Sequence, residues 1–314
     1  MSGPTIHFHW RDMKLYYYRG NNFGDKLNPV IWDALIPELV DEDDSTLLVG
    51  MGTLINSRVP AEPQKLVFGS GVGYNKAAQV DDKWKFYCVR GPLTAAALGL
   101  DKQVAITDPA LLLTRVVNQP VAPTGEVVFM PHHSSMLNAD WAPFCAKAGI
   151  TFLDPEADMH EVLTKIRGAK LVIAEAMHAA IVADAYRVPW VPVQCYEHIL
   201  GFKWEDWCQS MSVPYRPQTL PSVWDIDKTL SPRDRLAANV KRSLRGVGIW
   251  KCDWTPPPPA NNVRQIEDAV VGALSRLAGS GESYLSDERL QGEALERLLG
   301  KIDQLKRDYA VVAA

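Results

Sequence analysis

Short apolar runs alternate with stretches of helical period through about the first two thirds of the chain. Runs of this length are typical of buried strands, and the stretches between them are typical of helices that cover a sheet. The pattern therefore predicts an α/β fold. The predicted strands fall into two sets, first "KLYYY", "TLLVG", "KLVFGSG", "KFYCVR" and "VAITD", then "VVFMPHH", "ITFLD", "LVIAE" and "WVPVQ".

A proline-containing stretch, "VVNQPVAPTGE", separates the two strand sets. Because 314 residues exceed what one core usually holds, we expect two lobes, over residues 1–120 and 121–225, and a helical extension over residues 226–314. In the extension, "RDRLAANVKRSLRGVG" predicts a basic amphipathic helix, which "TPPPPANN" ends because proline cannot continue it. Two further helices follow, the last of them capped by Ser286 or Asp287.

Composition excludes several classes of protein. The chain is 47% hydrophobic with a formal net charge of −4, so it lacks the basic excess of a nucleic-acid binder. No apolar run is long enough to span a membrane, and the N-terminal segment does not have the pattern of a signal peptide. The five cysteines are scattered without CxxC spacing, which favours reduced thiols in a cytoplasm over disulfides or a zinc site.

The junction "LVIAEAMHAA" places Glu175 and His178 where a predicted strand turns into a helix. Ligands of open α/β sheets bind at such carboxyl ends of strands. In the first helical turn, His178 would meet an anion beside free N–H groups, and Glu175 could orient the imidazole or accept a proton. The alternative is that His178 is a structural histidine and that Glu175 caps the helix.

A second junction, "YRGNNFGDKLNP", contains Asn22, Gly24 and Asp25 after the first strand. The glycine permits a tight backbone where a helix begins. Asp25 is either the N-cap of that helix or a general base for a hydroxyl group.

Glycines also cluster in "FGSGVGYN", where Gly71 would let the backbone approach a ligand closely. The spacing of Gly69, Gly71 and Gly73 does not match GxGxxG, so no dinucleotide fingerprint is present. Arg90 ends another predicted strand and is suited to bidentate binding of carboxylate or phosphate. The competing interpretation pairs Arg90 with Asp108 in a structural ion pair.

Further candidates lie in the second strand set and just beyond it. His132 and His133 end the strand "VVFMPHH", although adjacent histidines rarely converge on one metal ion. Lys203 lies in "GFKWEDW" and could contribute a charge to phosphate binding, or it is simply solvated. Its neighbour Trp204 belongs either to the core or to a surface that stacks on a sugar.

Taken together, these segments resemble the polysaccharide pyruvyl transferase family. "NFGDKLNPVIWDAL" is similar to the family's N-terminal signature, and "CVRGPLTAAALGL" with "ITDPALLL" is similar to its arginine-to-DP block. "LVIAEAMHAAIVADAYRVPWVPV" resembles its R-L-H-G segment, and "FKWEDW" its lysine-bearing stretch. The resemblance covers about residues 14–210 and is greatest to the succinoglycan-type ketalase branch. Where the family has arginine before Leu-His-Gly this chain has Ala176, so that arginine contact is not carried over.

The resemblance implies two Rossmann-like lobes in a GT-B-like arrangement, with additional C-terminal helices. It also implies phosphoenolpyruvate as the donor and a pyruvate ketal formed on a sugar of an exopolysaccharide or its lipid-linked precursor. Because the sequence contains no metal-ligand constellation, we expect no metal and no cofactor. We expect His178 to be the acid/base or phosphate-contacting group, with Asp25 or Glu175 as base. The donor would be bound by Arg90 and Lys203 with His132 or His133, and the acceptor or its loop would involve Asn22, Gly24, Gly71 and Trp204.

Two other functions are compatible with the same sequence. One is a GT-B-like glycosyltransferase with a nucleotide-sugar donor, and the other is a non-catalytic glycan-binding or assembly protein, which the absent arginine favours. We expect a cytoplasmic protein, with membrane association at most peripheral, at the inner face of the cell membrane and aided by the basic helix. The acceptor sugar and the oligomeric state, a homo-oligomer included, are left open.

Overall fold

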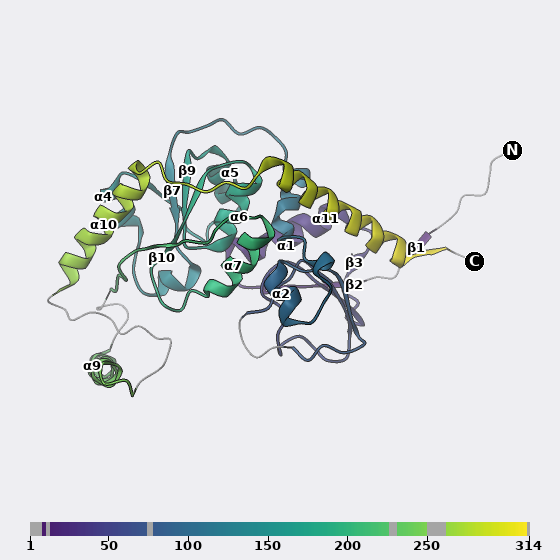
Figure 1. Ribbon diagram of the computed structural model, residues 1–314, viewed down its shortest axis with the longest axis horizontal. Coiled ribbons are helices and arrows are strands. Elements are labelled where there is room, and N and C mark those ends of the chain that lie inside the picture. Colours follow the sequence, from purple (N-terminus) through teal and green to yellow (C-terminus); the bar gives the residue numbers. More distant parts are fainter. Residues whose placement is uncertain (1–7, 11–12, 74–77, 226–230, 250–261, 313–314) are drawn as a thin grey trace. The chain divides into compact units, whose positions relative to one another are not determined.

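The structure is a computed structural model that describes residues 8–10, 13–73, 78–225, 231–249 and 262–312. The chain forms two compact units that are interleaved in sequence (Figure 1). Unit 1 comprises residues 1–120, 201–215 and 286–314, and unit 2 comprises residues 121–200 and 216–285. The sequence analysis expects each lobe and the extension to be one continuous segment. In the structure the units are discontinuous, because residues 201–215 and 286–314 belong to unit 1 together with residues 1–120.

The five strands of the unit 1 sheet are parallel and ordered β3-β2-β4-β5-β6. They are β2 (Met13–Tyr16), β3 (Val40–Asp41), β4 (Thr46–Val49), β5 (Gln64–Phe68) and β6 (Trp84–Cys88). The strand predicted over residues 104–108 is wrong. That segment makes a single bridge, from Ala105 to Val89, and lies between two short helices, so β3 is the fifth strand instead.

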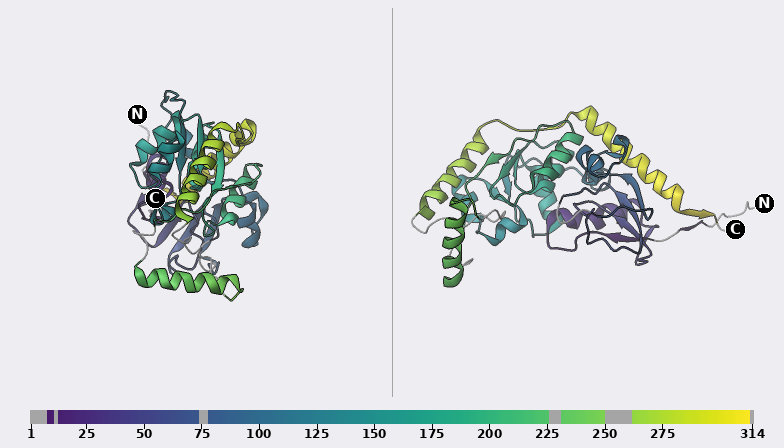
Figure 2. Two further views of the ribbon diagram at one scale, coloured as in Figure 1. Left: turned by 90° about the vertical axis from the view of Figure 1, so that its left-hand side faces the viewer. Right: turned by 60° about the horizontal axis from the view of Figure 1, so that its bottom comes forward.

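Helical elements connect and flank the strands of unit 1, and the longest of them packs against β6. These elements are α1 (Phe23–Leu35), α2 (Pro92–Ala97), η1 (Lys102–Val104), η2 (Pro109–Leu112), α3 (Leu113–Val116), α7 (Gly201–Ser210) and α11 (Glu288–Tyr309). Trp32 of α1 packs edge-on against Phe68 of β5, with ring centroids 4.9 Å apart. Figure 2 shows α11 as one long helix in yellow. Its start is capped as predicted, because Leu290 N donates to Asp287 Oδ1 at 3.0 Å.

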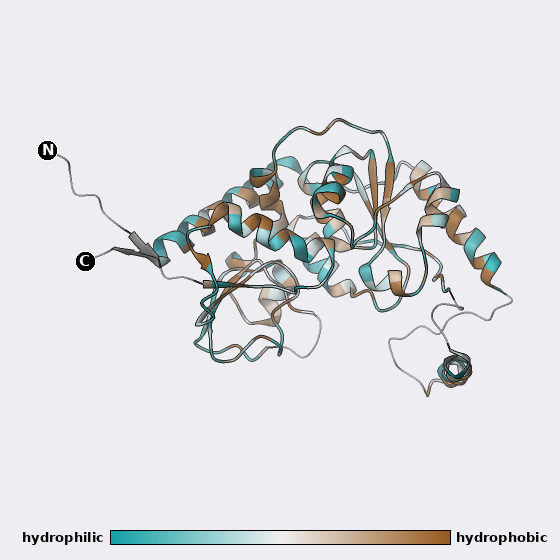
Figure 3. Cartoon of the chain, turned by 180° about the vertical axis from the view of Figure 1, so that it is seen from behind, coloured by the Kyte–Doolittle hydropathy of each residue, from teal (hydrophilic) through white to brown (hydrophobic). Residues whose placement is uncertain are grey.

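The unit 2 sheet also has five parallel strands, ordered β11-β10-β9-β7-β8. They are β7 (Val127–Met130), β8 (Thr151–Phe152), β9 (Leu171–Ala174), β10 (Trp190–Gln194) and β11 (Gln218–Thr219). Every residue of β9 is buried, as expected for the centre of a parallel sheet covered on both faces. The hydrophobic colouring of the strands of this sheet in Figure 3 agrees with that position.

Helices cover both faces of the unit 2 sheet, with α4 and α10 on one face and α5 and α6 on the other (Figure 1). The helical elements of this unit are η3 (His133–Leu137), α4 (Ala142–Ala148), α5 (Met159–Gly168), α6 (Met177–Ala185), α9 (Pro232–Gly246) and α10 (Val263–Gly279). The carboxyl ends of β7, β9 and β10 are adjacent, so the turns that follow them share one edge of the sheet.

Near the chain ends, β1 (Phe8–Trp10) pairs antiparallel with β12 (Ala310–Val312). Within the described ranges, no helix has both the length and the apolar character needed to cross a membrane. Among the described residues, four buried cysteines are in no disulfide, Cys88, Cys145, Cys195 and Cys208, whereas Cys252 lies outside the described residues.

Candidate active site

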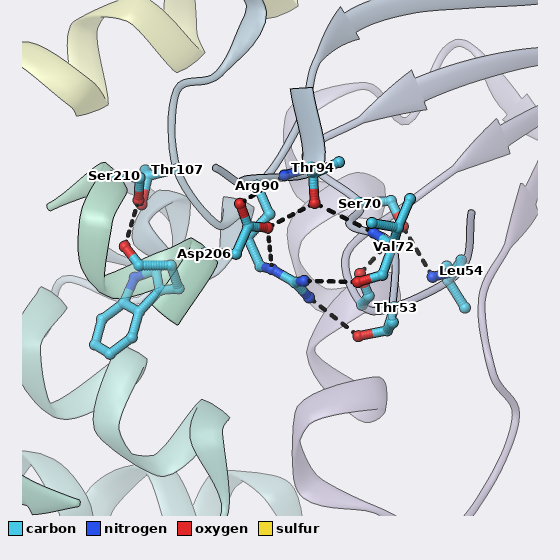
Figure 4. Close-up of polar contacts among 11 residues, drawn as sticks. Thr53, Leu54, Ser70, Val72, Arg90, Thr94, Thr107, Asp206 and Ser210 are labelled. Atoms are coloured by element: carbon cyan, nitrogen blue, oxygen red, sulfur yellow. Dashed lines mark hydrogen bonds and ion pairs between the residues drawn. The ribbon is translucent and has the colours of Figure 1, made fainter. Parts of the chain in front are cut away.

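In unit 1, Arg90 is fully buried at the start of α2, and its guanidinium is held on three sides (Figure 4). Nε donates to Asp206 Oδ2 at 3.0 Å, Nη1 to Thr53 Oγ1 at 3.0 Å, and Nη2 to the carbonyl of Val72 at 3.1 Å. Asp206, on α7, also accepts from Thr94 N at 2.9 Å and from Thr94 Oγ1 at 2.6 Å. This ion pair fastens α7 to the turns that follow β4, β5 and β6.

The ion pair that Arg90 forms is with Asp206 and not with Asp108, which was the partner considered from the sequence. Asp108 instead caps η2, its Oδ1 accepting from Ala110 N at 3.0 Å. Since the three guanidinium contacts of Arg90 are internal to unit 1, this geometry supports a positioning role for Arg90.

Two glycines make room for this pair. A Cβ atom at Gly71 would lie 2.3 Å from Nη2 of Arg90, and one at Gly91 would lie 2.0 Å from the carbonyl oxygen of Asp206. Both distances are far below van der Waals contact. The close approach expected at Gly71 is therefore an approach to Arg90 within the unit.

Helix α7 also carries Lys203 and Trp204, both of which are buried. The Trp204 ring stacks on Tyr215 with centroids 5.5 Å apart and meets Trp207 edge-on at 6.3 Å. Because Trp204 is fully buried, this geometry supports its interpretation as a core residue. Lys203 is 6% exposed and lies one turn before Asp206, so the ion pair that fixes α7 also fixes Lys203.

At the start of α1, Asn22 is the N-cap residue, and Gly24 and Asp25 lie in the first turn. The interpretation of Asp25 as the N-cap is therefore wrong. Asn22 Nδ2 donates to Asp25 Oδ2 at 2.7 Å, and Asp25 is 8% exposed. A carboxylate in the first turn is stabilised by the positive end of the helix dipole, which suits an ionised side chain.

In unit 2, Glu175 is fully buried just after β9, and its carboxyl group is hydrogen-bonded to the turns that follow β7 and β10. Oε2 accepts from His132 N and Oε1 from Cys195 N, each at 2.9 Å, and these residues follow β7 and β10. Burial raises the pKa of this carboxyl, and the N–H donors of His132 and Cys195 oppose that effect. The interpretation of Glu175 as a helix cap is wrong, because Ala176 occupies the N-cap position of α6.

Beside Glu175, a serine hydroxyl bridges two imidazoles. Ser134 Oγ lies 2.7 Å from His132 Nδ1 and 2.7 Å from His198 Nε2. A hydroxyl has one proton, so it donates to one ring and accepts from the other. Because Ser134 N also donates to His132 Nδ1, at 3.3 Å, that nitrogen is the acceptor. We assign the order His198 Nε2–H to Ser134 Oγ–H to His132 Nδ1, which leaves the proton of a neutral His132 on Nε2.

The remaining predicted residues of unit 2 lie next to this array. The rings of His132 and His133 are 4.4 Å apart between centroids. His178 is partly exposed and is the second residue of α6, three positions after Glu175. The structure therefore brings Glu175 and the histidines 132 and 133 together, and it places His178 on the helix that begins at the same strand end.

Sequence reasoning missed Asp206, Thr94, Ser134 and His198. Their partners are distant in sequence: 116 residues separate Arg90 from Asp206, and 64 separate Ser134 from His198. The only available signal was that "CYEHIL" follows a strand of the same sheet as "VVFMPHH". Over the part of the chain that the structure describes, no three His, Cys, Asp or Glu side chains are placed to hold a metal ion.

A family model described as polysaccharide pyruvyl transferase matches residues 4–195, more than half of the chain. The chain belongs to the polysaccharide pyruvyl transferase family. The chain is similar to the succinoglycan biosynthesis protein ExoV of Rhizobium meliloti (strain 1021), with 36% identity over 329 aligned positions, which span 95% of this chain and 100% of ExoV. No solved structure shows significant similarity to it. The family resemblance inferred from sequence motifs is thus confirmed.

Proposed function

We propose that this pyruvyl transferase uses phosphoenolpyruvate to form a pyruvate ketal on a sugar of an exopolysaccharide or its lipid-linked precursor. Membership of the family and the similarity to ExoV support a transferase of exopolysaccharide biosynthesis. The observation that carries the proposal is the shared edge of the unit 2 sheet. There Glu175 organises the turns after three strands, and His132 and His178 follow two of them.

The reaction requires that a carboxylate and a phosphate be bound and that protons move. Protonation of the methylene carbon of phosphoenolpyruvate gives an oxocarbenium-like centre, and one sugar hydroxyl attacks it and loses its proton. Cleavage of the C–O bond to phosphate regenerates such a centre, and the second hydroxyl attacks it. One hydroxyl proton balances the proton gained by the methylene carbon, and the other leaves with inorganic phosphate.

Each residue receives a role that fits its position. His178, in the first turn of α6, is the acid/base or phosphate-contacting group, and the N–H groups at that helix start favour an anion. His132 or His133 assists in binding the donor. Lys203 of α7 supplies positive charge, and Asp25 of α1 is the base for an acceptor hydroxyl.

Two predicted residues receive positioning roles instead. Both oxygens of Glu175 accept backbone N–H bonds in a fully buried position, and the guanidinium of Arg90 is held inside unit 1. Their contribution is to hold the turns and α7 in place.

The proposal includes a GT-B-like fold with two Rossmann-like lobes, in a cytoplasmic enzyme. The separate parallel sheet of each unit supports it, because each lobe of such an enzyme has its own sheet. In this proposal, Asn22, Gly24 and the turn around Gly71 in unit 1 contribute to acceptor binding.

The test incubates the purified chain with phosphoenolpyruvate and a panel of sugars and lipid-linked oligosaccharides. We expect phosphate release only with a suitable acceptor, and a product heavier than that acceptor by the mass of pyruvic acid less one water. Phosphoenolpyruvate should raise the melting temperature, whereas sugar nucleotides should not. Stabilisation by a sugar nucleotide with transfer of its sugar would establish the glycosyltransferase function instead.

His178→Ala should lower kcat/KM by about 10²- to 10⁴-fold, the usual contribution of an acid/base group, and leave the fold intact. His160→Ala is the matched control, because His160 is also the second residue of a unit 2 helix, α5, and is exposed. It should keep the wild-type rate. A His178→Ala enzyme with unchanged turnover would refute the role of this histidine.

A further inference from the structure

Helix α9 carries an exposed apolar face. Leu236 is 68% exposed and Val240 is 52% exposed, and Val247, just after the helix, is 69% exposed. With Leu244, these residues recur at intervals of four and three positions, which places them along one side of a helix. Exposed apolar residues are ordinary when scattered singly, whereas a stripe in helical register indicates a surface that contacts another apolar phase.

The same helix is basic within an acidic chain. Residues 232–246 contain five arginine or lysine residues and one aspartate, a net charge of +4, whereas the whole chain has −4 and the remainder therefore −8. Arg245 forms an ion pair with Glu197, and Arg242 donates to Asn239 within the helix. Figure 3 shows α9 end-on, with both hydrophobic and hydrophilic residues in the helix.

The exposed apolar face and the positive charge of α9 together indicate what kind of partner it binds. A helix of 15 residues with this charge is too short and too polar to span a bilayer. A nucleic acid offers phosphates but no apolar phase for Leu236 and Val240, and the acidic remainder of the chain opposes it. The surface of an anionic bilayer offers both negative headgroups and, just below them, an apolar region.

We propose that α9 docks on anionic phospholipid membranes, lying in the interface with Leu236, Val240, Leu244 and Val247 turned toward the acyl chains. Arg233, Lys241 and Arg242 contact the phosphate groups. This inference does not depend on the proposed reaction, in which no residue of α9 takes part.

The test measures co-sedimentation of the full-length protein with two kinds of vesicle, phosphatidylcholine alone and an equimolar mixture with phosphatidylglycerol. We expect binding to the mixed vesicles, weak binding to phosphatidylcholine, and loss of binding as salt is raised. The variant Leu236→Glu/Val240→Glu should bind at least about tenfold less, because it removes the apolar contact and adds negative charge.

The matched control is Leu137→Glu, at a leucine of η3 in the same unit that is 75% exposed. It should bind like the wild type. Because all three positions are exposed, circular dichroism and the melting temperature should be unchanged in both variants. Equal binding of the double variant and the wild type, equal binding to both vesicle types, or no binding to the mixed vesicles would each overturn the proposal.

A second arm tests the charge. Lys241→Glu/Arg242→Glu should lower binding to the mixed vesicles about tenfold and flatten its salt dependence, while binding to phosphatidylcholine stays weak. Unaltered salt dependence in this variant would also contradict docking through the basic residues.

Discussion

Both units bury a charged side chain after a parallel strand, but they neutralise it differently. In unit 1 the guanidinium of Arg90 meets the carboxylate of Asp206 at 3.0 Å, and both side chains are fully buried. In unit 2 each carboxyl oxygen of Glu175 accepts a backbone N–H bond, one from His132 and one from Cys195. Arg90 is thus neutralised by an opposite charge, whereas the carboxyl group of Glu175 is stabilised by the dipoles of two backbone N–H groups.

The difference between Arg90 and Glu175 shows that a charged residue at the end of a strand is not by that position alone a catalytic or binding residue. A buried ion pair has no net charge, so its main effect is to lock α7 against the turns around it. A carboxyl solvated by N–H groups in a buried site can change its protonation state, so the turns it holds become sensitive to pH. Substitutions at Asp206, Glu175 and Ser134 test that contrast.

The largest effect is expected from Asp206→Asn. The substitution leaves the buried charge of Arg90 without a countercharge and should cost about 3–5 kcal/mol of the free energy of unfolding. Urea denaturation followed by tryptophan fluorescence measures the loss. The double variant Arg90→Met/Asp206→Leu should recover part of it, because it removes both charges.

The control for this prediction is Lys83→Ala, which breaks the exposed ion pair of Lys83 with Glu62 in the same unit. It should change stability little, because exposed pairs are screened by water. If Asp206→Asn were as harmless as Lys83→Ala, the Arg90–Asp206 pair would not lock α7 in place.

A smaller effect is expected at Glu175. Glu175→Ala leaves the N–H groups of His132 and Cys195 without their acceptor and should cost about 1–3 kcal/mol in all. Thermal unfolding at several pH values measures this cost and gives the pH dependence of the wild type for comparison.

The sign of the pH dependence follows from the raised pKa of Glu175. Its stabilising contribution is fully present below the ordinary pKa of a glutamate, where the folded and unfolded chains both keep the proton. It is lost as the pH rises through the raised pKa, because the unfolded chain has released its proton earlier. Glu175→Gln has no such proton, so this part of the pH dependence should vanish. A Gln variant with the wild-type pH profile would show that Glu175 does not titrate in this range.

The smallest effect is expected from Ser134→Ala, which removes the hydroxyl between His132 and His198. Loss of a hydrogen bond of about 1 kcal/mol corresponds to about a fivefold lower kcat/KM in the proposed reaction. The pH–rate profile should shift as well, because His132 Nδ1 loses the shorter of its two hydrogen bonds and keeps only the one from Ser134 N. Ser134→Thr should restore both the rate and the profile. A lower rate with an unshifted profile would indicate a purely structural serine.

The sequence predicts the parts of this molecule that depend on local pattern. Buried runs such as "LVIA" and "TLLV" identify the central strands, and Asp287 marks the start of α11. The candidate residues were found in the same way, because strand ends can be located from the runs themselves.

What the sequence does not predict are pairings that the fold creates between distant segments. Nothing near Arg90 indicates that its partner is Asp206, and "FKWEDW" draws attention to its lysine and aromatic residues instead of its buried acid. His198 is similarly hidden, because only the order of β10, β9 and β7 in the sheet brings its turn toward Ser134.

The interleaving of the two units constrains how the protein can be made. Because the chain passes from one unit to the other after residues 120, 200, 215 and 285, the ribosome releases all five strands of the parallel sheet of unit 1 long before Asp206 and α11. Unit 1 therefore finishes folding only after most of unit 2 has been translated, against the usual order in which the N-terminal domain folds first. A gene truncated at codon 120 should accordingly yield an aggregating fragment in place of an autonomous domain.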